Sequence, residues 1–280
     1  MAFALLIGLV GIIVGAGLAL IAEVVPDASG GGSSPRTCDN CSTSLPVAAL
    51  SPVRNQTSTC QECGHKVSAA RIPVVITTGV IFSVIALVIG PRWQLAPVLL
   101  LAASLIALSA VDLARYRLPD RLVFPSLGLA VVLIAALSIA NGEGDHVQRA
   151  VVTALAYSFL LLIPNIISPS GLAFGDVKLA LLLGLFLGWS ADSALDAARL
   201  VIWAFLIGMI FGIFSGVLLG VGRRAFGSNF LPDPDFPPPE DGSLEPLLKT
   251  AIPFGPALAL STLGLVVFSQ TVLSGGGILA

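Results

Sequence analysis

The chain has 280 residues, of which 56% are hydrophobic and 11% are charged, and its formal net charge is −2. Soluble domains usually carry about 25% charged residues, so this composition excludes an ordinary globular protein and indicates an integral membrane protein. The mean hydropathy of +0.97 supports the same class, and the small negative charge gives no reason to expect nucleic acid as a partner.

Eight apolar segments follow one another along the chain. They cover residues 2–25, 72–89, 95–111, 122–140, 150–167, 177–189, 200–221 and 251–272. Most approach the roughly 20 residues that cross a hydrocarbon layer of about 30 Å as an α-helix. The sixth is shorter, and we expect it to be a true but short span. The first lacks the basic start of a secretory signal, so we expect it to be retained. The sequence predicts an all-α polytopic membrane protein with eight transmembrane helices.

Basic residues are distributed unequally between the two sides that eight spans define. One side holds Arg36, Arg54, Lys66, Arg71, Arg115, Arg117, Arg121, Lys178, Arg223, Arg224 and Lys249, and the other holds Arg92, Arg149 and Arg199. Because positive residues gather in cytoplasmic loops, the first side is predicted to be cytoplasmic and both termini to lie outside.

Two long loops on the predicted cytoplasmic side divide the chain. The expected units are a first transmembrane helix (1–25), a cytoplasmic four-cysteine loop (26–71), a membrane core of spans two to seven (72–222), a cytoplasmic loop rich in proline and acidic residues (223–250), and a last helix with its tail (251–280). Several glycines within the spans recur at a spacing that lets helices pack closely in lipid: Gly184, Gly188, Gly208, Gly212, Gly216 and Gly220.

The four-cysteine loop has the pattern CxxC, eighteen residues, CxxC, formed by Cys38, Cys41, Cys60 and Cys63. Each pair can place two thiolates on one metal ion, and two pairs complete a tetrahedral zinc site. A disulfide pair or a thioredoxin-like redox centre is disfavoured because the loop is predicted to be cytoplasmic. His65 could replace a thiolate, but we expect it to be exposed to solvent. Four thiolates leave no open position, so the predicted zinc knuckle is structural.

Two aspartates stand beside long apolar stretches, where a carboxylate is hard to solvate. Asp112 follows LLLAASLIALSAV at the end of the third span, and Asp176 precedes VKLALLLGLFLG at the start of the sixth. The distribution of basic residues places both at the cytoplasmic face. Two carboxyls that meet there would share one proton, which is the arrangement of an aspartic protease. We therefore predict a catalytic pair.

The alternative role for these residues is helix capping. An acid at the amino end of the sixth span, as at Asp176, would satisfy unpaired backbone N–H groups. Asp120 in the LPD run before the fourth span fits this role better, and we assign it there. Asp112 lies where a helix ends, and there a negative charge faces the negative end of the helix dipole. That unfavourable position favours a functional role.

With these motifs in view, the chain is similar to the type IV prepilin peptidases, which are membrane aspartic peptidases with a GxGD signature. The resemblance rests on VDLARYRLPD around Asp112, GLAFGDVKLA around Asp176, and IPFGPALAL beginning at Ile252. It implies that Asp112 and Asp176 form the catalytic dyad. It also implies that Gly175 lets the substrate backbone approach closely, and that Lys178 either steadies the charge near Asp176 or reaches to the lipid interface.

The resemblance further implies a location in the bacterial inner membrane and a substrate class. The substrates would be type IV prepilins or pseudopilins, whose short basic leader stays in the cytoplasm and is removed at the membrane surface. Membrane lipid is the other expected partner.

The sequence departs from the family pattern at two places. Ala173 stands where the first glycine of GxGD is expected, and the stretch GAGLALIAEVVP with Glu23 lacks the polar motif of members that also methylate the new amino terminus. S-adenosylmethionine is therefore expected as a cofactor only if methyl transfer is retained. Two other classes compete with the peptidase: a transporter or channel that uses intramembrane acids, and a non-catalytic assembly factor that carries zinc.

Overall fold

The computed structural model describes residues 1–24, 57–59, 62–64, 66–68, 71–115, 120–167, 174–226 and 254–272. These residues form eight helices and two strands. The elements are α1 (Ala2–Val24), β1 (Thr57–Thr59), β2 (Lys66–Ser68), α2 (Arg71–Ile89), α3 (Leu95–Arg115), α4 (Asp120–Ala140), α5 (Gly144–Ile167), α6 (Phe174–Trp189), α7 (Ala194–Phe226) and α8 (Gly255–Val272). The short antiparallel hairpin, in which Thr59 pairs with Lys66, is an addition to the predicted all-α fold.

Six of the described helices are long and apolar enough to cross a membrane. They are α1, α2, α3, α4, α5 and α7. Helix α6 has 16 residues, and α8 is a shorter apolar helix. The structure confirms a helical multi-pass membrane protein, and the count of eight spans remains a prediction.

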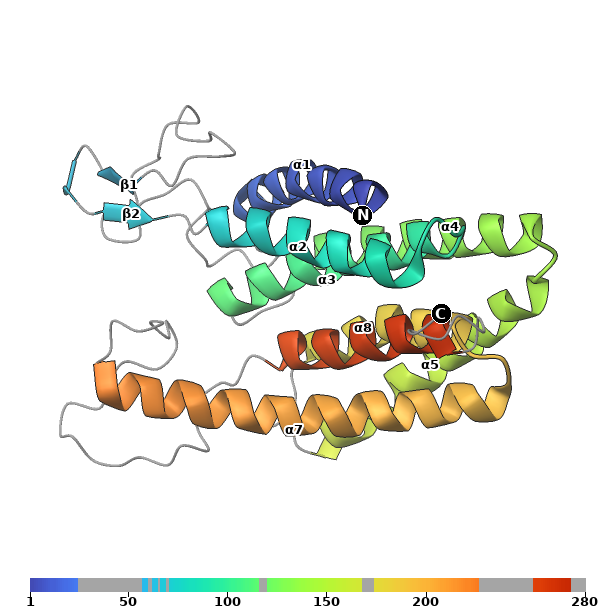
Figure 1. Cartoon of the computed structure of the whole chain (residues 1–280). Helices are drawn as coiled ribbons and strands as arrows, with labels where there is room; N and C mark the ends of the chain where they lie inside the picture. Colours follow the sequence, from blue (N-terminus) through green and yellow to red (C-terminus); the bar gives the residue numbers. More distant parts are fainter. Residues whose placement is uncertain are drawn as a thin grey trace.

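Successive helices run back and forth, so the bundle has two distinct ends (Figure 1). At one end α1 stops, the β1–β2 hairpin lies beside the bundle, α2 starts, α3 stops and α4 starts. We call this the hairpin end. At the opposite end, short connectors at residues 90–94, 141–143 and 190–193 join α2 to α3, α4 to α5 and α6 to α7. We call this the connector end.

Helix α6 forms the centre of the bundle. From Val177 to Trp189 nearly all of its side chains are buried, whereas α4, α5 and α7 keep large apolar side chains on their outer faces, as a surface against lipid requires. A helix that neighbours enclose need not span the full bilayer by itself, which explains why α6 can be short.

The two α6 glycines permit close packing against α5. A Cβ atom at Gly184 would lie 2.7 Å from the Cα of Ala154, and one at Gly188 would lie 2.6 Å from the carbonyl oxygen of Arg149. Both neighbours are backbone atoms, which cannot move aside as a flexible side chain can. The predicted role of these glycines in close helix packing is confirmed.

Two helices start six residues earlier than the apolar pattern indicates, because polar residues contribute to their first turns. Helix α5 begins at Gly144 instead of residue 150, and α7 begins at Ala194 instead of residue 200. At α7 the hydroxyl of Ser193 accepts a hydrogen bond from the Asp196 backbone N–H (3.1 Å) and donates one to the Asp196 carboxylate (2.6 Å). This reciprocal capping stabilises a polar helix start.

Candidate active site

Asp112 lies in the last turn of α3 and is 6% exposed. Its carboxyl accepts a hydrogen bond from the backbone N–H of Gly255, the first residue of α8. The other carboxyl oxygen, Oδ2, is buried and has no hydrogen-bond partner among the described residues. Asp112 therefore retains an acceptor that neither solvent nor the described protein uses.

Gly255 approaches this carboxyl so closely that no side chain would fit between them. A Cβ atom at position 255 would lie 2.7 Å from Oδ2 of Asp112. The sequence motif IPFGPALAL contains Gly255, but no role was predicted for it. The contact joins residues 112 and 255, which are distant in the sequence, so only the fold reveals it.

Asp176 lies in the first turn of α6 and is 5% exposed. The next residue, Val177, accepts a hydrogen bond on its carbonyl oxygen from the Ser158 hydroxyl of α5 (2.9 Å). Tyr157, also on α5, is fully buried and interacts electrostatically with Asp176. Its hydroxyl has no hydrogen-bond partner among the described residues. The start of α6 therefore lies beside two polar residues of α5, Tyr157 and Ser158.

Lys178 connects the start of α6 to the start of α4. Its ammonium group lies 2.5 Å from Oδ1 of Asp120 and above the rings of Phe124 and Phe174, at 5.8 and 5.0 Å from their centroids. The sequence suggested that Lys178 steadies Asp176 or reaches to the lipid interface, and the structure shows Asp120 as its ion-pair partner. Asp120, predicted as a helix cap, is the first residue of α4 and also forms this ion pair.

The helices that carry Asp112 and Asp176 share two neighbours. Helices α4 and α8 each pack against both α3 and α6. Helix α3 ends at the hairpin end, and the Lys178–Asp120 ion pair fixes the first turn of α6 at the start of α4, at that same end. Gly175 precedes Asp176 in this turn and is partly buried. The arrangement brings two buried carboxyls to one end of the bundle.

Most of the predicted zinc site lies outside the described residues. Cys38, Cys41, Cys60 and His65 are not described, whereas Cys63 lies in the turn between β1 and β2. Gly64, directly after it, has a φ of +68°, a left-handed conformation that suits glycine. No group of three or more metal-ligating side chains occurs within the described ranges, so the zinc knuckle remains a prediction.

The region that contains both aspartates is similar to a known protein family. Residues 99–217 match the model of the type IV leader peptidase family. The chain is 32% identical over 159 residues to a prepilin leader peptidase/N-methyltransferase of Aeromonas salmonicida (strain A449), covering 55% of this chain and 51% of the relative. A Stutzerimonas stutzeri protein of the same name is 27% identical over 219 residues, which is 78% of this chain and 64% of the relative.

A third protein of that name, from Neisseria gonorrhoeae, is 30% identical over 190 residues, covering 65% of this chain and 61% of its own length. The chain thus spans between about half and two thirds of the relatives it matches. No solved structure is significantly similar to it. Both buried aspartates lie within residues 99–217, the region that matches the model of the type IV leader peptidase family.

Proposed function

We propose that this protein is a prepilin peptidase, an aspartic endopeptidase that removes the short leader of type IV prepilins or pseudopilins at the cytoplasmic face of the bacterial inner membrane. The observation that carries the proposal is the pair of buried carboxyls, Asp112 and Asp176, at one end of the bundle and inside the family-matched region. Burying a carboxyl costs free energy, and catalysis is a physical reason to keep two of them at one end of the bundle.

The proposed reaction divides two roles between these carboxyls. One, ionised, removes a proton from a water molecule, and the water oxygen attacks the carbonyl carbon of the scissile peptide bond. The other, protonated, donates its proton to the carbonyl oxygen. When the tetrahedral intermediate collapses, the carbon–nitrogen bond breaks and the amine leaves with the proton that came from water. One hydroxyl of the intermediate returns a proton to the second carboxylate, so a carboxylic acid forms and the starting protonation of the pair is restored. Gly255 lets the start of α8 approach Asp112 closely enough for its backbone N–H to bind the carboxyl, and the small residue Gly175 leaves room for an extended substrate backbone beside Asp176.

The four cysteines are proposed to hold one structural zinc ion on the same side of the membrane. The turn at Cys63 and the left-handed Gly64 support this, because a CxxC metal knuckle needs such a tight turn. Elemental analysis of the purified chain should find about one zinc per molecule. A Cys60→Ser/Cys63→Ser variant should lose the metal, and a folded wild-type protein without zinc would contradict the assignment.

The deciding experiment is co-expression with a candidate prepilin, followed by mass measurement of the amino terminus of the product. Asp112→Asn and Asp176→Asn should each abolish cleavage while the protein still inserts in the membrane, because the amide can neither accept nor supply the catalytic proton. Asp145→Asn, an exposed acid at the connector end, is the matched control and should cleave normally. Complete processing by either of the first two variants would refute the dyad.

The same measurement distinguishes the competing functions. A transporter or an assembly factor would leave the prepilin leader intact in every variant. We propose peptide cleavage as the activity of this chain and not methyl transfer, although the relatives are also named N-methyltransferases. An added methyl group on the new amino terminus would appear directly in the measured mass.

A further inference from the structure

The connector end contains a cavity of about 230 Å³, on the opposite end of the bundle from Asp112 and Asp176. It lies among the three connectors and the end of α8. The residues that line it are Trp93, Gln94, Glu143, His146, Trp189, Ser190, Asp192, Ser269 and Gln270. The peptidase reaction proposed above uses none of them.

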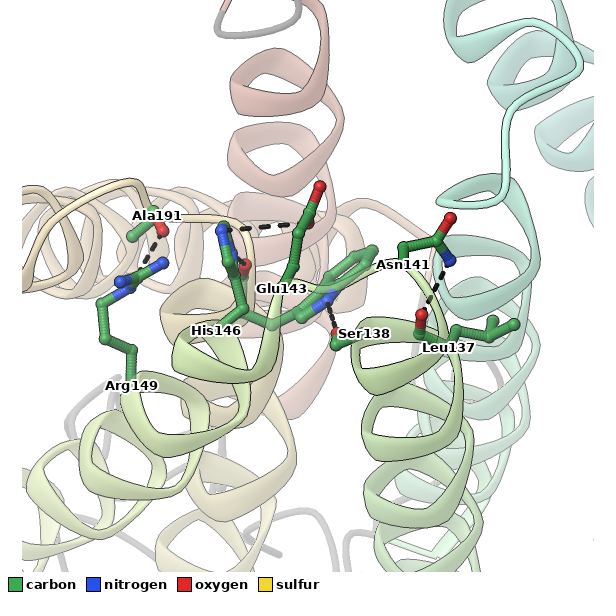
Figure 2. Close-up of polar contacts among 8 residues, drawn as sticks. Leu137, Ser138, Asn141, Glu143, His146, Arg149 and Ala191 are labelled. Atoms are coloured by element: carbon green, nitrogen blue, oxygen red, sulfur yellow. Dashed lines mark hydrogen bonds and ion pairs between the residues drawn. The ribbon is translucent and has the colours of Figure 1, made fainter.

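Hydrogen bonds among the helix ends fix the residues around this cavity, and Figure 2 draws these contacts. Nδ1 of His146 donates to the carbonyl oxygen of Trp189 (2.8 Å), and Nε of Arg149 donates to the carbonyl oxygen of Ala191 (3.1 Å). The indole N–H of Trp189 donates to the hydroxyl of Ser138 (3.1 Å). Each bond joins residues at least 42 positions apart in the sequence, so the cavity is built by the tertiary fold.

The cavity lining is acidic and aromatic. Glu143 and Asp192 contribute two carboxylates, and none of the described lining residues is lysine or arginine. Nε2 of His146 lies 3.9 Å from Oε2 of Glu143 (Figure 2). Trp93 and Trp189 form one wall, with ring centroids 5.8 Å apart in an edge-to-face arrangement. Oε1 of Gln94, another lining residue, is buried without a hydrogen-bond partner among the described residues. The lining therefore offers acceptors, negative charge and aromatic rings, which together attract a cation.

We propose that this cavity binds an organic ammonium group. Aromatic rings combined with carboxylates are the typical environment of organic ammonium ions, because the ring faces and the acids both favour positive charge. A bare metal ion fits less well, since no group of three metal-ligating side chains is present in the described parts of the chain. The volume suits a small head group better than a drug-sized molecule, which needs about 300 Å³ or more. The ammonium can come from a free amine or from an ethanolamine phospholipid.

Tryptophan fluorescence of the full-length protein in detergent provides the first test. Trp203 lies on the exposed face of α7, away from the cavity, so a Trp203→Phe background leaves Trp93 and Trp189 as the only indoles. Titration with ethanolamine should give a saturable change, and ethylene glycol, which has nearly the same shape but no charge, should give none. An equal response to both compounds, or to sodium chloride at matched ionic strength, would overturn the proposal.

Charge-removing variants test which residues hold the cation. Glu143→Gln/Asp192→Asn should weaken ethanolamine binding about tenfold or more, because each lost carboxylate removes a charge-assisted hydrogen bond. Asp145→Asn removes an exposed acid two residues after Glu143, in the first turn of α5 and outside the cavity lining, and should leave binding unchanged. If both variants lost affinity equally, the effect would be general surface charge, and the cavity assignment would be wrong.

A bilayer experiment distinguishes the two sources of the ammonium. The protein is placed in nanodiscs of phosphatidylethanolamine or phosphatidylglycerol, and thermal unfolding is followed for the wild type and for Glu143→Gln/Asp192→Asn. Higher stability in phosphatidylethanolamine that the double variant abolishes assigns the site to the lipid head group. Saturable ethanolamine binding without that lipid effect assigns it to a free amine, and the lack of both responses overturns the proposal.

Discussion

At the residue scale, the size of residue 255 controls the surroundings of Asp112. A Cβ atom there would lie 2.7 Å from Oδ2, so Gly255→Ala must push the carboxyl or the start of α8 aside. Misplacing a catalytic group by about 1 Å can reduce a rate about a hundredfold. We expect leader cleavage by Gly255→Ala to fall by a factor of that order, mainly in kcat, because the reacting carboxyl and not the leader-binding surface is displaced.

The matched control for that variant is Gly264→Ala, on the same helix. A Cβ atom at Gly264 meets nothing within 4 Å, so this alanine should leave cleavage and thermal stability near those of the wild type. Cleavage is measured by mass spectrometry of the product and stability by thermal unfolding in detergent. Normal cleavage by Gly255→Ala would show that the close approach to Asp112 has no catalytic importance.

The ion pair between Lys178 and Asp120 predicts a different pattern of effects. Both side chains are partly exposed, so their coupling free energy should be about 0.2–1 kcal/mol. In a double-mutant cycle, Asp120→Asn and Lys178→Met should each lower stability slightly, and the double variant should be no less stable than the worse single variant. Strictly additive losses would mean that Lys178 acts through another partner.

The roles of single residues were predictable only where chemistry and position agreed in the sequence. Asp112 and Asp176 stood out because a carboxylate beside an apolar run needs an explanation. The partner of Lys178 could not be predicted, since Asp120 is 58 residues away and an interfacial lysine has several acceptable neighbours. Gly255 was equally hidden, because its importance depends on where the end of α3 lies.

At the scale of elements, the contact between α5 and α6 depends on the absence of side chains at two positions. We predict that Gly184→Ala lowers the free energy of unfolding by about 1–3 kcal/mol, the usual effect of overpacking. Its Cβ atom would meet the backbone of Ala154 and Thr153 at 2.7 and 2.8 Å, so the helices must separate. Thermal unfolding in detergent measures the loss.

Gly128→Ala on α4 is the control for this substitution. Its Cβ atom would face open space, and alanine favours helix more than glycine does, so stability should stay level or rise slightly. If Gly184→Ala were as stable as Gly128→Ala, the helices would tolerate separation and the close packing would not be a source of stability.

Helix existence was predictable from the apolar runs, but helix bounds were predictable only in part. Helix α2 spans Arg71–Ile89, within one residue of the predicted range, because its apolar run ends in a proline and glycine connector. The start of α7 was missed by six residues, because Asp196 and Arg199 interrupt the apolar pattern in ALDAAR and the cap at Ser193 was not recognised. The hairpin of β1 and β2 was also missed, since three-residue strands leave too short a pattern to recognise.

At the scale of the whole molecule, the bundle has chemically different ends. Asp112, Asp176 and the Cys63 turn belong to the hairpin end, and the acidic aromatic cavity belongs to the connector end. The number and order of the apolar runs predicted this alternation of helix directions. The cavity was not predictable, because its lining comes from four separate segments whose polar residues look like ordinary loop residues in the sequence.

The distribution of basic residues predicts that the hairpin end of the bundle faces the cytoplasm, and cysteine labelling can test this orientation. All four native cysteines lie in the loop before α2, which is predicted to be cytoplasmic. A membrane-impermeant maleimide should therefore not label the wild type in intact cells. Asp145→Cys introduces a thiol at an exposed position of the connector end and should be labelled there. After the cells are permeabilised with metal chelator present, the native cysteines should react as well.

Labelling of the wild type in intact cells, with Asp145→Cys adding nothing, would reverse the orientation. It would also place both aspartates on the side away from a cytoplasmic leader, which is incompatible with the proposed cleavage.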